Sequence, residues 1–469
     1  MIIVLNLLIK PFYLFAIDAQ VQNTVGAEDY GMYFSLLNFS FLFNIVLDIG
    51  INNYNTKNIA QHPNTVVKYI GPILGLRFIL GGAYFALSIG LALLLGYDNF
   101  QMHLLSLLVF NQFLAGLLLY LRSNFAGLHL FRIDAILSVL DRFLLIIICA
   151  VLLYSSWIET PFKIEWFVYA QTVTYFITVL VALVLSYIKI GRVQFAFRQL
   201  FSRALLKQST PYALLILLMM LYTRMDAVMI ERLLPEGQEQ AGIYAQGFRL
   251  LDAVNMFAFL VAGLLLPIFA RQIKQRESIK PILNSAALML VGTAFVLGIA
   301  ASQSAVTLME IIYNQEIDAA SHSFRWIILS FIPMAASHVF GTLLTANGNL
   351  KLLNRMALAG IAVNFTANLI LIPMFKAEGA AFATLGTQSL TSLIQILLVL
   401  RVFQLNVHYK HLAKIGLLLF VLLAASHYIL LWNNRAMGFF ATLLVGTAAL
   451  FLFRIVDIRT IVRLLREKT

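Results

Sequence analysis

The chain is organised around residues 210–270, which read TPYALLILLMMLYTRMDAVMIERLLPEGQEQAGIYAQGFRLLDAVNMFAFLVAGLLLPIFA. Pro211 suits the first turn of a helix, where a missing amide would be unpaired anyway. The apolar run 212–234 that follows is long enough to cross a bilayer. A polar loop at 235–240 leads into a second apolar run, so the stretch predicts a helical hairpin in lipid.

Each run of this hairpin carries charges. Arg224 and Asp226 lie near the middle of the first run, and Arg249 and Asp252 lie in the second. A charge at the centre of a membrane costs about 2.5–3.5 kcal/mol on insertion scales, so an intramembrane pair is a functional hypothesis by default.

A similar pattern occurs near the start of the chain, where residues 25–33 read VGAEDYGMY. Gly31 and Tyr33 match Gly242 and Tyr244 at one constant offset of 211 residues. This offset lays the first half of the chain over the second. Internal repeats are typical of transporters, whose binding site lies at the repeat interface near the membrane midplane.

The composition indicates a multi-pass membrane protein. Of 469 residues, 61% are hydrophobic and 12% are charged, and the apolar runs have the length of membrane helices rather than barrel strands. We therefore expect an all-α fold. Cys149 is the one cysteine, which excludes an intrachain disulfide. Met1 opens directly into an apolar segment, and we expect the natural chain to start a little upstream.

Hydropathy predicts about fourteen transmembrane helices. The predicted spans are 1–22, 30–52, 66–95, 101–121, 133–154, 165–188, 211–234, 243–268, 281–300, 324–346, 352–373, 379–403, 411–431 and 436–455.

These spans divide into four regions. We expect an N-terminal lobe of six helices at 1–188, a basic cytoplasmic linker at 189–210, and a C-terminal lobe of six helices at 211–403. The remainder, 404–469, contains two additional helices and a basic cytoplasmic tail.

Lysine and arginine define the orientation in the membrane. The odd-numbered connections and the span ends beside them hold only Lys163, Arg232, Lys376 and Arg435, whereas the basic residues on the side of the even-numbered connections and the tail are far more numerous. Both termini are therefore predicted to be cytoplasmic. The net charge of +12 is explained by this bias, so we expect membrane lipids as partners and no nucleic acid.

Several short motifs carry a resemblance to a known family. They are GAEDYG at 26–31 and DIGI at 48–51, Asp226 with GIY at 242–244, ANG at 346–348, Asn364, Asn368 and Pro373, and GAA at 379–381. Through these motifs the chain resembles the polysaccharide-biosynthesis (Wzx-type) oligosaccharide flippases, in the superfamily that also contains multidrug-efflux transporters and lipid II flippases.

The resemblance implies two pseudo-symmetric six-helix lobes around a central cavity, with two further C-terminal helices and a rocking type of alternating access. The implied substrate is an oligosaccharide unit on polyprenyl pyrophosphate, carried from the cytoplasmic to the outer leaflet of a bacterial plasma membrane for O-antigen, capsule or exopolysaccharide synthesis. A polysaccharide polymerase and glycosyltransferases of the same pathway are the implied partners, and one chain suffices as a monomer. Helices one, two, seven and eight line the cavity in relatives.

Cations inside the spans are the candidates for binding a pyrophosphate. We predict that Arg224, Lys10, Arg249 and Arg142 form this site, because arginine suits bidentate phosphate contacts. The alternative is that each cation pairs with a carboxylate of the fold. Asp141 adjoins Arg142, and Asp252 stands three residues after Arg249.

Buried acids and amides form two further candidate sets. Asp226, Asp252 and Asp48 are candidates for ion coupling, with charge neutralisation as the alternative. The amides recur at helical spacing and could line a sugar path or join helices, and they are Asn44, Asn52, Asn364 and Asn368.

No metal-binding pattern, cofactor motif or ATP-binding phosphate loop occurs in the sequence, so we expect a transporter without cofactors and not an enzyme. Three alternatives stay open. A multidrug efflux antiporter and a lipid II flippase belong to the same superfamily, and a membrane polysaccharide polymerase or glycosyltransferase belongs to another class.

Overall fold

The computed structural model describes residues 2–52, 55–56, 59, 62, 66–155, 160–191, 199–406, 409–430 and 435–456. Part of the predicted basic linker, 192–198, and the predicted basic tail beyond residue 456 lie outside the described residues. Among the residues that are described, the regular elements are all helical.

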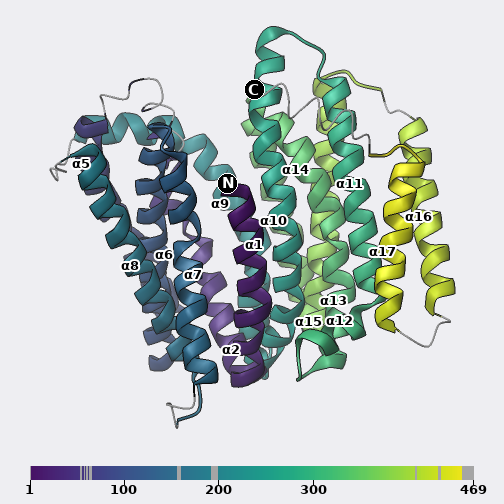
Figure 1. The fold of residues 1–469 in the computed structure, drawn as a ribbon, viewed down its shortest axis with the longest axis horizontal. Helices are drawn as coiled ribbons and strands as arrows, with labels where there is room; N and C mark the ends of the chain where they lie inside the picture. Colours follow the sequence, from purple (N-terminus) through teal and green to yellow (C-terminus); the bar gives the residue numbers. More distant parts are fainter. Residues whose placement is uncertain are drawn as a thin grey trace. The chain divides into compact units, whose positions relative to one another are not determined.

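The helices in chain order are α1 (Ile2–Tyr13), the π-helix η1 (Leu14–Asp18), α2 (Ala19–Leu42), α3 (Ile45–Asp48), α5 (Val66–Leu94), α6 (Asn99–Gly127), α7 (Phe131–Tyr154), α8 (Ile164–Ile190), α9 (Gln199–Leu233), α10 (Gly237–Gln275), α11 (Lys280–Gln303), α12 (Ala305–Ile312), α13 (Ile317–Leu329), α14 (Phe331–Ala346), α15 (Leu350–Val402), α16 (Tyr409–Leu430) and α17 (Arg435–Leu452). They are drawn in Figure 1.

Within the described part of the chain, ten helices are long and apolar enough to cross a membrane. The prediction of an all-α, multi-pass membrane protein is therefore confirmed. The count differs from fourteen for local reasons. Helix α15 joins two predicted spans, Met437–Leu452 in α17 is shorter than a full span, and α1 and α2 are not among the ten.

The chain forms two compact units, Met1–Gly242 and Ile243–Thr469. The boundary falls inside α10, and the first unit includes α9, which packs along α2. In the second unit, α14 packs on α15, and the hairpin of α16 and α17 packs on α11. Figure 1 shows this hairpin in yellow.

Several predicted helix ends are wrong in an informative way. Helix α9 begins at Gln199 and runs through Pro211, so this proline is not at the first turn. The predicted span 30–52 is broken, because α2 ends at Leu42 and the short α3 is closed by Ile49 in the left-handed region, at φ 42°. A residue so placed ends the regular helix and leaves backbone carbonyls to be satisfied by other partners.

At two further positions a single residue with non-helical backbone angles separates two helical segments that have no loop between them. Gly26 (φ 90°) bends the chain inside α2, close to the predicted boundary between the first two spans. Lys376 (φ 54°, ψ −132°) does the same inside α15, between the predicted spans 352–373 and 379–403. Because one residue is enough to change the direction of the chain here, the helical segments on either side of Gly26 and of Lys376 need no polar loop between them.

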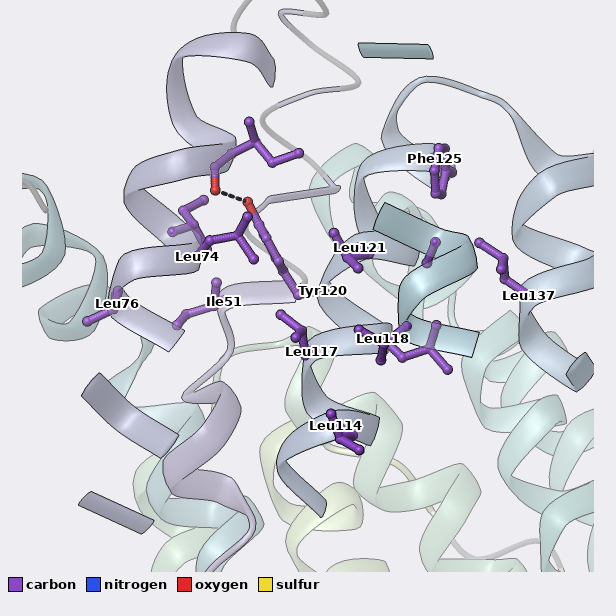
Figure 2. Packing of buried hydrophobic residues seen from close by; sticks show 14 of the residues in the cluster. Ile51, Leu74, Leu76, Leu114, Leu117, Leu118, Tyr120, Leu121, Phe125 and Leu137 are labelled. Atoms are coloured by element: carbon purple, nitrogen blue, oxygen red, sulfur yellow. Dashed lines mark hydrogen bonds between the residues drawn. The ribbon is translucent and has the colours of Figure 1, made fainter. Parts of the chain in front are cut away.

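A hydrophobic core in the first unit joins α5 and α6 (Figure 2). Leu74 and Leu76 of α5 and Leu117 and Leu121 of α6 belong to this core, and all four are buried. The hydroxyl group of Tyr120 donates to the Ile70 carbonyl at 3.1 Å, which ties the two helices through one polar contact inside the apolar cluster.

The glycines that revealed the repeat lie against each other. A Cβ atom on Gly31 would overlap the backbone of Gln238 and Gly242, and a Cβ atom on Gly242 would overlap Ala27. The Gln22 side-chain amide donates to the Gly242 carbonyl at 2.9 Å. Helix α2 and the first turn of α10 therefore meet backbone to backbone, which only glycine permits at these positions.

This contact makes a prediction for Gly31→Ala. The added methyl group has only backbone to displace, so we expect a loss of about 1–3 kcal/mol in stability, as overpacking produces elsewhere. The unfolding midpoint of the purified protein in detergent would fall by several degrees. Gly82→Ala is the matched control, because a Cβ atom there meets nothing within 4 Å. Equal midpoints for the two variants would contradict the proposed backbone contact.

Candidate functional site

Two of the predicted cations lie on neighbouring helices of the first unit. Helix α1 packs on α7, and the Asn6 amide donates to the Ser138 hydroxyl group at 2.9 Å, which sets the register of the pair. Lys10 and Arg142 stand four residues after Asn6 and Ser138, on the next turn of each helix. Arg142 and Asp141 are the main charged neighbours of Lys10.

Aromatic groups and one acid surround Arg142. Its Nη2 donates to the Tyr175 hydroxyl group at 2.8 Å, and its guanidinium group lies 4.9 Å from the centre of the Tyr13 ring. Asp141 Oδ2 lies 3.4 Å from Arg142 Nε. We call Lys10, Tyr13, Asp141, Arg142 and Tyr175 the α1–α7 cluster.

A buried acid borders this cluster on η1. Asp18 is 1% exposed and accepts hydrogen bonds from Tyr13 at 3.2 Å and from Tyr30 at 2.6 Å. Further along on α2, Tyr33 accepts from the Gln171 amide at 2.8 Å. A π-helix is rare and often occurs at functional sites. The cluster and Asp18 thus share Tyr13 as a common neighbour.

Sequence reasoning assigned Lys10 and Arg142 to one site with Arg224 and Arg249, but it did not predict that α1 packs on α7. Tyr175 was missed, and so were Asn6 and Ser138. The contacts join α1 to α7, which is more than a hundred residues away along the chain. Helical periodicity gives no signal for such pairs.

Arg224 has a different setting, on α9 where it packs along α2. Its Nη1 lies 3.5 Å from Asn38 Oδ1, and its guanidinium group lies 5.4 Å from the centre of the Phe41 ring. Asp226 is 1% exposed, whereas Arg224 is only partly buried. Residues two apart on a helix point to different faces, which accounts for this contrast.

Arg249 and Asp252 belong to the second unit. They lie three residues apart on α10 and are both partly buried. Asn364 and Asn368 are fully buried in the same unit on α15, and the Asn368 amide donates to Asn364 at 3.2 Å.

Asn44, Asp48 and Asn52, which were predicted on the second span, form hydrogen bonds with side chains of the first unit. Arg77, which is 2% exposed, donates to Asp48 at 2.6 Å, to Asn52 at 2.5 Å and to the Leu47 carbonyl at 2.5 Å. Asn44 donates to Gln112 at 2.8 Å. The structure therefore gives Asp48, Asn44 and Asn52 structural partners on α5 and α6.

The second unit also contains an apolar pocket of about 380 Å³. Helices α11, α14, α15 and α16 contribute to its walls, with Phe295, Pro333 and Leu419 among the lining residues and Ser302 and Gln303 at its polar side. Its chemistry suits a hydrocarbon chain. Among the described residues, no group of three acids, histidines or cysteines is arranged to hold a metal ion.

Many long apolar helices with charged groups between them are typical of a multi-pass membrane protein. Residues 13–273, more than half of the chain, match the family described as polysaccharide biosynthesis protein, and the chain belongs to this family.

Solved structures agree on the fold. The chain is similar to the lipid II flippase MurJ in an inward closed conformation, with a TM-score of 0.76 and 14% identity over 98% of this chain and 100% of that one. It is also similar to an inward-facing multidrug resistance MATE family transporter of the MOP superfamily, with a TM-score of 0.62 and 14% identity over 83% and 93% of the two chains. The Vibrio cholerae MATE transporter VcmN in the bent form gives a TM-score of 0.51 and 13% identity over 84% and 92%. No curated protein matches the sequence.

The contacts of Arg77 make a prediction that separates structural from functional cations. Arg77→Met leaves Asp48 without its cation and the Leu47 carbonyl without its donor, and breaking a buried pair in this way costs about 3–5 kcal/mol. We expect a large fall in the unfolding midpoint and in the yield of folded protein. The added change Asp48→Leu should recover part of the loss.

Arg325→Met is the control for this experiment. The Arg325 side chain is exposed, and its backbone carbonyl receives a hydrogen bond from Ser302 that the substitution leaves in place. A midpoint for Arg77→Met as high as that of Arg325→Met would show that the Arg77 contacts do not hold the broken second span.

Proposed function

We propose that this protein is a flippase that moves oligosaccharide units linked to polyprenyl pyrophosphate from the cytoplasmic to the outer leaflet by alternating access. Membership of the polysaccharide biosynthesis family and the transporter fold support this class. The observation that carries the proposal is the α1–α7 cluster, where Lys10 and Arg142 lie together between membrane helices.

The cluster offers two cations to an anion, Lys10 and Arg142. Its own carboxylate is Asp141, and Asp18 at its border is bound by the hydroxyl groups of Tyr13 and Tyr30. Arg142 is held in place by Tyr175 and Tyr13, so a phosphate group meets a guanidinium group that is already oriented. Preorganised charge-assisted hydrogen bonds to phosphate are strong in a dry environment.

The other predicted residues have separate roles in each unit. Arg224 of the first unit and Arg249 of the second are each proposed to give the head group a further cationic contact during transport. Asp226 and Asp252 bind a coupling ion or neutralise these arginines. Asn364 and Asn368 lie on the sugar path, and the apolar pocket of the second unit suits the polyprenyl chain.

The driving force need not come from ATP. A membrane potential that is negative inside drives an anionic head group outward by about 2.3 kcal/mol per charge for each 100 mV. The proposed setting is a bacterial plasma membrane with both termini in the cytoplasm. The protein would work as a monomer beside the glycosyltransferases and the polymerase of its pathway.

A lipid II flippase is the second candidate. The likeness to MurJ extends over nearly the whole of both chains and supports it. The two candidates differ in the glycan and share the polyprenyl pyrophosphate. The α1–α7 cluster serves either substrate, so glycan selectivity has to separate them.

Reconstitution into liposomes tests the function. Vesicles would carry polyprenyl pyrophosphate with a labelled oligosaccharide, or lipid II, and arrival in the opposite leaflet would be followed with and without an imposed potential. We expect transport of an oligosaccharide lipid that is faster than transport of lipid II. Faster transport of lipid II would favour the second candidate. A glycan that lengthens instead of moving would overturn the proposal in favour of a polymerase.

The same assay tests the cationic site. Arg142→Gln retains hydrogen-bonding groups near Tyr175 but removes the charge, so we expect transport to fall at least about tenfold, the effect of losing roughly one charge-assisted contact. Arg142→Lys should recover part of the rate. Arg355→Gln, at an exposed position, is the control. Full transport by Arg142→Gln at normal expression would remove Arg142 from the site.

A further inference from the structure

Asn255 and His338 form a polar pair within the second unit, outside the α1–α7 cluster. The Nε2 atom of His338 on α14 lies 2.9 Å from Asn255 Oδ1 on α10. Asn255 stands close to the middle of the 39-residue helix α10, and both residues are only partly buried. Polar groups at this depth are expensive unless they face protein or water.

An aromatic ring lies beside this pair. Phe259 is one turn after Asn255 on α10, and its ring centre lies 6.2 Å from that of His338 at an interplanar angle of 78°. The Phe259 side chain is 66% exposed, although it borders two polar groups.

The helical spacing shows which way this surface faces. Arg249, Asp252, Asn255 and Phe259 follow one another at steps of three, three and four residues, so they occupy one face of α10. A face that carries two charges and an amide is unsuited to hydrocarbon. Phe257, which is 43% exposed, lies two residues before Phe259 and so on a different side of the helix.

From this geometry we propose that Asn255, His338 and Phe259 form a neutral carbohydrate subsite that recognises the glycan of the transported lipid. This inference rests on the proposed function. It assigns recognition of the glycan to these three residues, whereas the proposed function assigns binding of the pyrophosphate to the α1–α7 cluster.

The donors and acceptors of Asn255 and His338 match those of a sugar. Because Asn255 Oδ1 accepts from His338 Nε2, the Asn255 amide nitrogen is available as a donor and His338 Nδ1 as an acceptor. Neighbouring hydroxyl groups of a sugar offer both an acceptor and a donor. The exposed ring of Phe259 supplies an apolar surface for the C–H face of the same sugar, which a charged site would not.

Binding measurements on the full-length protein in nanodiscs test this subsite. The probes are undecaprenyl pyrophosphate without sugar and undecaprenyl pyrophosphate that carries a neutral trisaccharide. We expect Asn255→Leu and Phe259→Ala to weaken binding of the glycan lipid at least about tenfold, while binding of the bare lipid changes less than about twofold. Phe257→Ala is the matched control, and His338→Gln, which can still donate to Asn255, should retain most of the affinity.

The outcomes separate this inference from the function on which it rests. Wild-type protein that binds both lipids with equal affinity would overturn the sugar subsite and leave the flippase proposal intact. Equal effects of Phe257→Ala and Phe259→Ala, or parallel losses for both lipids, would also overturn it. Wild-type protein that binds neither lipid would overturn the proposed function and the subsite together.

Discussion

The exclusion of water from the membrane interior decides how the charges between the membrane helices of this protein are bound. A cation between apolar helices must find acceptors in the protein or in a ligand. Arg77 and Arg142 give the two solutions. Arg77 is 2% exposed and its guanidinium group binds two side chains and a backbone carbonyl, whereas the Arg142 side chain is 26% exposed and has one acid and two tyrosines around it. The first is bound by the fold, and the second retains some exposure, which is the basis on which it is proposed to bind an anion.

The break in the second span and the burial of Arg77 depend on each other. A helix that stops at Asp48 frees its last carbonyl groups, and one of these, on Leu47, receives a hydrogen bond from Arg77. The same guanidinium group pairs with Asp48. The Arg77 charge would be costly alone, but here it binds both the Leu47 carbonyl and the Asp48 carboxylate at the point where the helix ends. A continuous helix at 30–52 would have satisfied its own carbonyls and left Arg77 without this role.

The sequence predicted what depends on local composition and failed where distant segments decide. Hydropathy found the helices because each span must satisfy its own backbone hydrogen bonds in lipid. It could not find the start of α9, since the residues before Pro211 are polar and their helix is not required by a membrane. It could not find the packing of α1 on α7 or the contact between Asn255 and His338, because neither helix alone carries a periodic pattern that reveals its register with a distant helix.

The glycines from which the repeat was predicted meet each other in the structure. At an offset of 211 residues, Ala27 corresponds to Gln238 and Gly31 to Gly242, and the overlaps that a methyl group would cause are reciprocal: Gly31 faces Gln238, and Gly242 faces Ala27. A reciprocal contact of this kind is what a two-fold relation between the two segments predicts. Its surfaces are backbone, so few side chains are interlocked there. At both positions the neighbouring backbone leaves no room for a side chain, so the approach of α2 to the first turn of α10 requires glycine at 31 and at 242.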